Sequence, residues 1–239
     1  MAIAFEIKGP IALYRKPYTT TSTVSFPIPT PTSVAGLIAA ILGFENNSNE
    51  HSAASFYWRH MKGTRIAIQR LNHTSWFSAA LNFWNTKNPQ NNIHNQISHQ
   101  FVRNPHYRIF VDGNLSNRLG NQMADGQYYY TPCLGTAYAL AEPKYLGEFN
   151  PTKTSSLDEI TVHSVLPLST QAESHINFLG TQGIMKDTFP FRLDEKRQVI
   201  ESITLLYPSS PDRGILLQPW EQLDYFDYQG GAIVWLPSW

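Results

Sequence analysis

The chain opens with a stretch in which apolar and more polar side chains alternate. Residues 3–8 read Ile-Ala-Phe-Glu-Ile-Lys, and a period of two residues is typical of a half-buried β-strand. Gly9-Pro10 then marks a break, because both residue types interrupt regular structure. The first element is therefore predicted to be a strand.

A helix is predicted shortly afterwards, ending before Gly43. Thr30 or Thr32 can cap its first turn, and Pro31 is tolerated there. Gly43 is suited to end the helix. Its other face carries only alanine and glycine, which permits close backbone approach. The apolar face recurs at helical spacing: Val34, Leu37, Ile38, Ile41 and Leu42.

The remainder of the chain is rich in short apolar stretches. A short helix is predicted over 53–61, and polar loops over 82–95, with six asparagines among 14 residues, and over 112–127. Strands are predicted over 64–71, 75–83, 100–111, 137–149, 160–168, 200–207, 214–217 and 232–236. One helix after the first strand, followed by hairpins, is typical of an α+β fold with a ferredoxin-like or RNA-recognition-type βαββ opening.

Composition is that of a packed globular protein. The 239 residues include 42% hydrophobic and 15% charged residues, and so low a charge content disfavours disorder. A chain of this length forms one large domain or two small ones. A single cysteine, Cys133, excludes an internal disulfide and a cysteine zinc cluster. We see no signal-peptide pattern and no apolar run long enough to span a membrane, so we expect a cytoplasmic protein without membrane association.

Charge is unevenly distributed although the net charge is zero. Residues 1–120 carry 11 Lys and Arg against 4 Asp and Glu, whereas residues 121–239 carry 7 against 14. A basic N-terminal half can attract phosphates. Alternatively, the fold interleaves the two halves and cancels this asymmetry.

The most distinctive stretch is FEIKGPIALYRKPYTTTSTVSFPIPTPTSVAGLIAAILG, residues 5–43. It resembles the N-terminal signature of the Cas-five family, the RAMP-type subunit of type I CRISPR Cascade complexes. Weaker matches follow in the same order at 130–135, 164–167 and 190–197, and the length and strand-rich end suggest the type I-B subgroup. The signature elements are Gly9-Pro10, Arg15-Lys16-Pro17, Thr19 to Thr23, Pro27 to Pro31 and Gly36 to Gly43.

The resemblance implies a fold and an organisation. Family members have a ferredoxin-like core with a protruding β-hairpin thumb, which we place at about 82–100. We expect a RAMP domain over 1–120 and a strand-rich part over 121–239 packed on it, or one continuous domain. The expected thumb carries only Lys87 as a cation before residue 100, which is few for an RNA clamp.

The resemblance also implies a role. It predicts a non-catalytic subunit that binds the 5′ handle of the CRISPR RNA (crRNA) and caps the complex backbone, in support of antiviral defence. The implied partners are the crRNA, the Cas-seven backbone subunit, the Cas-eight large subunit and target DNA near the PAM-proximal end. No cofactor is implied.

The segment 14–22 supplies the groups that single-stranded RNA requires. Cations can neutralise phosphates, aromatic rings can stack on bases, and hydroxyls can bond to the backbone or the 2′-hydroxyl. The alternative is an ordinary solvated loop that caps the following helix. The candidate contacts are Tyr14, Arg15, Lys16, Tyr18, Thr19, Thr20, Thr21 and Ser22. Arg70, Arg103 and Arg108 on predicted strands would join them if they shared a face with this loop, and would otherwise face water.

Two other functions remain open. A family member in type I-C systems cuts precursor RNA with Tyr, Lys and His, and here His99, His106 and Tyr107 could approach Lys16. No spacing joins these residues into a site, so we assign no catalytic residue. No phosphate-binding loop and no metal-ligand spacing is present, and we assign no metal. The other possibility is a β-rich interaction protein with no RNA role.

Overall fold

The computed structural model describes all residues except 20, 46–54, 85–89, 91–93 and 153–157. The described helices are α1 (Pro31–Leu42), α2 (Trp58–Met61), α3 (Ser116–Ala124) and α4 (Thr170–His175). The strands of the N-terminal part are β1 (Ala2–Lys8), β2 (Ile11–Ala12), β3 (Tyr14–Arg15), β4 (Thr23–Phe26), β5 (Thr64–Arg70), β6 (Ser75–Trp84), β7 (His94–Arg103), β8 (His106–Gly113) and β9 (Glu142–Phe149). Those of the C-terminal part are β10 (Ile160–Val162), β11 (Leu166–Pro167), β12 (Ile184–Leu193), β13 (Val199–Pro208), β14 (Ile215–Leu217), β15 (Tyr225–Tyr228) and β16 (Gly231–Val234).

The central sheet has the strand order β5-β8-β1-β9, and its neighbours are antiparallel. Helix α1 lies between β1 and β5 in the chain, and α3 lies between β8 and β9. This is a βαββαβ arrangement, as in ferredoxin-like folds. The strands at the two edges of the sheet, β9 and β5, are the fourth and the second of its four strands in chain order. The predicted α+β fold with a ferredoxin-like core is confirmed. None of the described helices is long and apolar enough to cross a membrane.

Helix α1 begins and ends where its sequence predicts. The Thr30 hydroxyl accepts a hydrogen bond from the Ser33 amide at 3.0 Å, and Pro31 is the first helical residue. Gly43 ends the helix in the left-handed region at φ 75°, a conformation that favours glycine. The apolar face is buried, but Ala35 and Ala39 on the opposite face are buried too. The helix is therefore enclosed on most sides rather than lying on the surface.

Helix α3 replaces the loop predicted at 112–127. A glycine inside a helix costs about 1 kcal/mol relative to alanine, so Gly120 argued against this helix. In the structure a Cβ at Gly120 would lie 3.1 Å from both Ile3 Cγ2 and Tyr145 Oη, so the glycine permits close packing on the sheet. The domain boundary expected at residue 120 falls inside α3, and the ferredoxin-like unit extends through β9 to Phe149.

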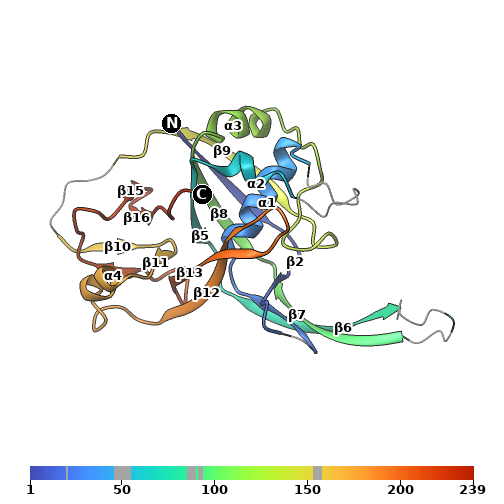
Figure 1. The fold of residues 1–239 in the computed structure, drawn as a ribbon. Coiled ribbons are helices and arrows are strands. Elements are labelled where there is room, and N and C mark those ends of the chain that lie inside the picture. The colour runs from blue at the N-terminus through green and yellow to red at the C-terminus, as the bar shows by residue number, and fades with distance from the viewer. Residues whose placement is uncertain (20, 46–54, 85–89, 91–93, 153–157) are drawn as a thin grey trace.

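A long hairpin formed by β6 and β7 projects from the body of the molecule (Figure 1). Its ten pairs run from Ser75↔Arg103 to Trp84↔His94 without a register shift. The single strand predicted at 100–111 is wrong, because Asn104 at φ 45° and Pro105 separate β7 from β8. Because β6 begins at Ser75, the thumb begins earlier than the predicted residue 82. Lys87 lies outside the described residues.

The C-terminal part covers the second face of the central sheet. One face packs with α1 through Ile3, Phe5 and Ile7. The other carries small residues, and the aromatic side chains of the C-terminal strands fill the space above them. This second cluster comprises Ala2, Ala4, Ala67, Phe110, Phe226, Ile233 and Trp235. The two parts of the chain thus share buried cores.

Residues beyond β16 close the free edge of β5. The Leu236 amide donates to the Ile66 carbonyl at 2.8 Å, and the Trp239 amide donates to the Thr64 carbonyl at 3.0 Å. In return, the Gly63 amide donates to the Trp239 carbonyl at 3.0 Å. This pairing satisfies backbone groups that an edge strand would otherwise expose.

Ion pairs join the basic half of the chain to the acidic half. Lys16 pairs with Asp187 at 3.1 Å and Arg59 with Glu195 at 2.5 Å, and Arg65 contacts Asp224. The fold therefore interleaves the two halves, which cancels part of the charge asymmetry of the sequence.

Glu6 on β1 is held by Arg108 and His106 from the neighbouring strand. It accepts hydrogen bonds from Arg108 Nη2 at 2.8 Å and is 3.1 Å from His106 Nε2. Burial raises the pKa of Glu6, but hydrogen bonds and charge from Arg108 and His106 outweigh this and lower the pKa below its ordinary value of 4.5. A lowered folded-state pKa stabilises the fold above the unfolded pKa, and this contribution is lost as pH falls through the folded value.

We predict that Glu6→Gln lowers the free energy of unfolding at pH 7 by about 1–3 kcal/mol, because it leaves Arg108 without its carboxylate partner. Urea denaturation of both proteins between pH 7 and pH 3 measures the difference. The difference should shrink as pH falls below 4.5. A difference that stays constant over this range would contradict the assignment.

Candidate nucleic-acid interface

The segment predicted to bind RNA forms the turn between β3 and β4. Tyr14 pairs with Phe26 and Arg15 with Ser25, so the described residues between the two strands, 16–19, 21 and 22, lie at the tip of this turn. Strand β4 also runs parallel to β7, with Thr23 opposite His99. The turn therefore lies beside the base of the projecting hairpin (Figure 1), and together they form one surface.

Several predicted contact residues are accessible on this turn. Arg15 is exposed, and its Nη2 donates to the Thr19 carbonyl at 3.0 Å. Tyr18 is 68% exposed, and Lys16 Nζ lies over its ring, 6.0 Å from the centre. Thr21 is exposed, Thr19 and Ser22 are half-buried, and Thr20 lies outside the described residues. The accessible groups are one guanidinium, one ring and a set of hydroxyls.

Tyr14 does not offer a stacking surface, so this part of the prediction is wrong. It is 2% exposed and packs edge-on against Tyr107, with ring centroids 6.1 Å apart. Burial raises the pKa of Tyr14 well above its ordinary value. A two-residue strand gives no readable alternation, so the sequence could not show which way Tyr14 faces.

Lys16 is compensated by an acidic partner. Its Nζ lies 3.1 Å from Asp187 Oδ1, and the two side chains are 19% and 18% exposed. Burial lowers the pKa of Lys16, but the contacts with Asp187 and Tyr18 outweigh this and raise it. Tyr207 donates a second hydrogen bond to Asp187 at 2.5 Å. Lys16 therefore ties the turn to β12 and β13 rather than presenting a free charge.

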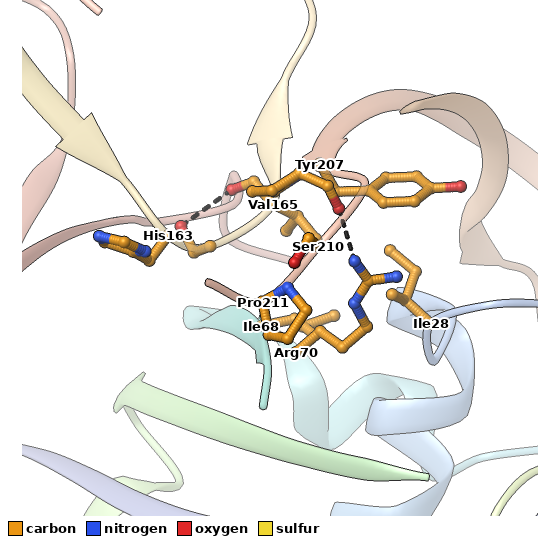
Figure 2. Close-up of a pocket in the computed structure, with 10 residues that line it drawn as sticks. Ile28, Ile68, Arg70, His163, Val165, Tyr207, Ser210 and Pro211 are labelled. Atoms are coloured by element: carbon orange, nitrogen blue, oxygen red, sulfur yellow. Dashed lines mark hydrogen bonds between the residues drawn. The ribbon is translucent and has the colours of Figure 1, made fainter. Parts of the chain in front are cut away.

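Arg70 is also a structural residue. The Arg70 side chain extends from β5 and lines a small pocket together with Ile28, Val165 and Tyr207 (Figure 2). Its guanidinium donates to Thr74 Oγ1 at 2.6 Å and to the Pro208 carbonyl at 2.8 Å. Burial lowers the pKa of Arg70. Arg70 thus links the central sheet to the C-terminal part.

The other two arginines, Arg108 and Arg103, lie on different parts of the molecule. Arg108 is paired with Glu6 and lies over the Tyr228 ring at 5.4 Å, on the sheet face that the C-terminal part covers. Arg103 is exposed at the base of the hairpin, 5.8 Å from the centre of the Phe77 ring. Of the three arginines proposed from the sequence, only Arg103 lies on the surface that carries the turn.

The hairpin adds aromatic side chains to this surface. Trp76 and Trp84 are 39% and 62% exposed. On the opposite face Phe77 stacks on Phe101 at 5.1 Å, and the stack continues through His99 to Phe83. Phe83 and Phe101 were not predicted as surface groups, although the alternation along 75–84 places Phe83 on the same face as Phe77.

The residues considered for catalysis do not meet at an accessible surface. Tyr107 is 1% exposed and donates its hydroxyl to the Pro27 carbonyl at 2.8 Å. His99 is 5% exposed, and His106 contacts Glu6. Among the described residues, no group of three His, Cys, Asp or Glu side chains could hold a metal ion.

Comparison with known families decides the relationship that the opening sequence suggests. Residues 2–147 match the sequence model of the family described as CRISPR-associated protein (Cas_Cas5). The chain belongs to the Cas_Cas5 family. The matched region covers the ferredoxin-like sheet, the turn at 16–22 and the hairpin. No curated protein matches the sequence.

Solved structures show the same fold as this Cas_Cas5 protein. A CRISPR protein from Archaeoglobus fulgidus has a TM-score of 0.56 at 11% identity, covering 98% of this chain and 99% of that one. A chain of a CRISPR RNA-guided surveillance complex has a TM-score of 0.54 at 13% identity, covering 88% and 90%. A chain of the Type III-B Cmr-beta complex bound to cognate target RNA has a TM-score of 0.54 at 12% identity, covering 90% and 86%.

We predict that Lys16→Ala and Arg15→Ala have different effects on stability. Lys16→Ala leaves Asp187 half-buried without its cation and should lower the free energy of unfolding by about 1–3 kcal/mol. Arg15→Ala removes an exposed side chain and should change it by less than about 0.5 kcal/mol. Urea denaturation of the two variants at pH 7 measures both effects. Equal losses would contradict the structural role of Lys16.

Proposed function

We propose that this Cas_Cas5 family member is a non-catalytic subunit of a type I CRISPR Cascade complex that binds the 5′ handle of crRNA. It caps the complex backbone next to the large subunit and supports RNA-guided DNA targeting in antiviral defence. The observation that carries the proposal is the exposed turn with Arg15 and Tyr18 beside the projecting hairpin, in a chain of this family.

The accessible groups match the chemistry of a single RNA strand. A guanidinium can bind a phosphate through two parallel hydrogen bonds, which Arg15 can offer once it releases the Thr19 carbonyl. Tyr18 can stack on a base of any identity. Thr21 and Ser22 can bond to phosphate or 2′-hydroxyl groups. Arg103 supplies a second cation at the base of the hairpin.

The proposed partners follow from the same role. The surveillance complex and the Cmr-beta complex that contain chains of this fold are multi-subunit assemblies. For this chain we propose the Cas-seven backbone subunit, the Cas-eight large subunit and target DNA near the PAM-proximal end as partners, in the cytoplasm. In RNA-guided complexes base pairing reads the sequence and the protein holds the backbone, so such a subunit needs no active site.

The alternative is an endoribonuclease that matures precursor crRNA. Metal-free cleavage needs a base and an acid placed at the scissile phosphate. Tyr107 and His99 are buried, and His106 is engaged by Glu6. These observations favour the non-catalytic role.

We predict that Arg15→Ala weakens binding of the free protein to CRISPR repeat RNA about tenfold, because it removes a charged hydrogen-bond donor to phosphate. The slope of log K against log salt should fall by about 0.7 for each lost phosphate contact. A gel shift with end-labelled repeat RNA in EDTA, repeated at several salt concentrations, measures both quantities.

Lys62→Ala is the matched control, because Lys62 is an exposed cation just before β5, at the end of that strand remote from the hairpin. It should leave affinity and slope unchanged. Arg15→Ala with wild-type affinity and slope would refute the assigned contact. A denaturing gel of the same samples tests the other claim, since a cut product in EDTA would refute the non-catalytic role.

A further inference from the structure

Strand β6 has one free edge. Its ten residues pair with β7 along one side. Within the described part of the chain, β7 is its single paired neighbour, because β2 and β4 lie on the opposite edge of β7. The backbone N–H and C=O groups of the outer edge are therefore open to another strand.

This edge lacks the features that protect natural edge strands. Such strands are usually shortened, bulged, or supplied with charged residues or proline. Residues 75–84 contain no charged residue and no proline, and their register against β7 has no shift. Trp76, Phe83 and Trp84 are 39%, 41% and 62% exposed on this strand. A long, uncharged aromatic edge of this kind is suited to pairing with another polypeptide strand.

The order of residues on β6 indicates which strand is suited to pair with its free edge. Residues 76–84 read Trp-Phe-Ser-Ala-Ala-Leu-Asn-Phe-Trp, which is nearly the same in both directions about Ala80. An antiparallel copy centred there opposes aromatic with aromatic, polar with polar and aliphatic with aliphatic side chains. The opposed pairs are Trp76 with Trp84, Phe77 with Phe83, Ser78 with Asn82, Ala79 with Leu81, and Ala80 with Ala80 of the second copy.

We propose that two copies of this chain pair edge to edge through antiparallel β6 strands, about a twofold axis at Ala80. A twofold interface is self-complementary, since residue i of one copy meets residue j of the other and the reverse. Any strand paired with an antiparallel copy of itself meets this condition, and the near-palindrome of residues 76–84 adds that Trp opposes Trp and Phe opposes Phe across the axis. The product is a four-stranded sheet in the order β7-β6-β6-β7.

The register is also consistent with strand geometry. Opposed residues differ by an even number of positions, so each lies on the same face as its counterpart. The even-numbered residues of β6 are all exposed, and pairing joins Trp76 and Trp84 on that face. On the other face Phe77 meets Phe83 and extends the existing stack with Phe101 and His99. Directly opposed aromatic pairs stabilise antiparallel strands.

The interface is small, so the pair should be weak. Nine paired residues span roughly 30 Å at about 3.3 Å per residue, and small interfaces of this class are typical of transient association. We therefore expect a dimer that dissociates in the micromolar range. This inference rests on the outer edge of β6, whereas the proposed RNA role rests on the turn between β3 and β4 and on Arg103 of β7.

Sedimentation equilibrium of the full-length protein over a concentration series tests the proposal. The wild type should change from monomer to dimer. Ala80→Lys should weaken the dimer at least tenfold, because the twofold axis places the two new ammonium groups directly opposite each other. Ser98→Lys is the matched control: Ser98 pairs with Ala80 on β7, is also exposed, and lies roughly 14 Å from its counterpart across the four-stranded sheet.

Cross-linking provides a second readout that does not depend on weakening the dimer. In a Cys133→Ser background, Ala80→Cys should link two copies through a short bis-maleimide, whereas Ser98→Cys should not. Unchanged circular dichroism would exclude misfolding of the variants. A wild type that stays monomeric at every concentration would overturn the proposal, and so would a dimer equally insensitive to both lysine variants, since it would form through another surface.

Discussion

Burial of β1 on both faces determines which surfaces remain for recognition. Ile3, Phe5 and Ile7 pack against the helices, while the small Ala2 and Ala4 leave room for aromatic residues of the C-terminal strands. A free RNA-recognition domain presents its bare sheet to bases, but here that face is an interior. The surfaces left for the proposed contact with RNA are therefore those that project from the body, the β6–β7 hairpin and the turn beside it.

The same packing shows how a chain with zero net charge can still present exposed cations on one surface. Acidic residues of the C-terminal half neutralise specific cations of the N-terminal half, as Asp187 does for Lys16. These pairs fix the position of the turn without adding charge to the surface. Exposed Arg15 and Arg103 lie close to the hairpin base, so local placement rather than overall charge defines the candidate interface.

The sequence predicted those features that depend on local rules. Helix α1 could be delimited because Thr30 and Gly43 carry recognisable capping chemistry, and the ferredoxin-like core followed from the resemblance carried by residues 5–43. Helix α3 could not be predicted, because Gly120 lowers helix propensity and its benefit lies in contact with Ile3, distant in the chain. The roles of Tyr14, Arg70 and Arg108 depend on partners far along the chain, which no local pattern encodes.

The closing of β5 by residues 236–239 has a consequence for how the protein is made. Leu236 is 170 positions after Ile66, whose carbonyl it bonds. At about 5–20 residues per second, a ribosome needs roughly 10 to 30 s to synthesise that interval. During this time the growing chain carries an open strand edge, which is prone to aberrant pairing. Completion of the central sheet is therefore a late, long-range event, and the edge of β5 stays unpaired until the residues that cover it have been synthesised.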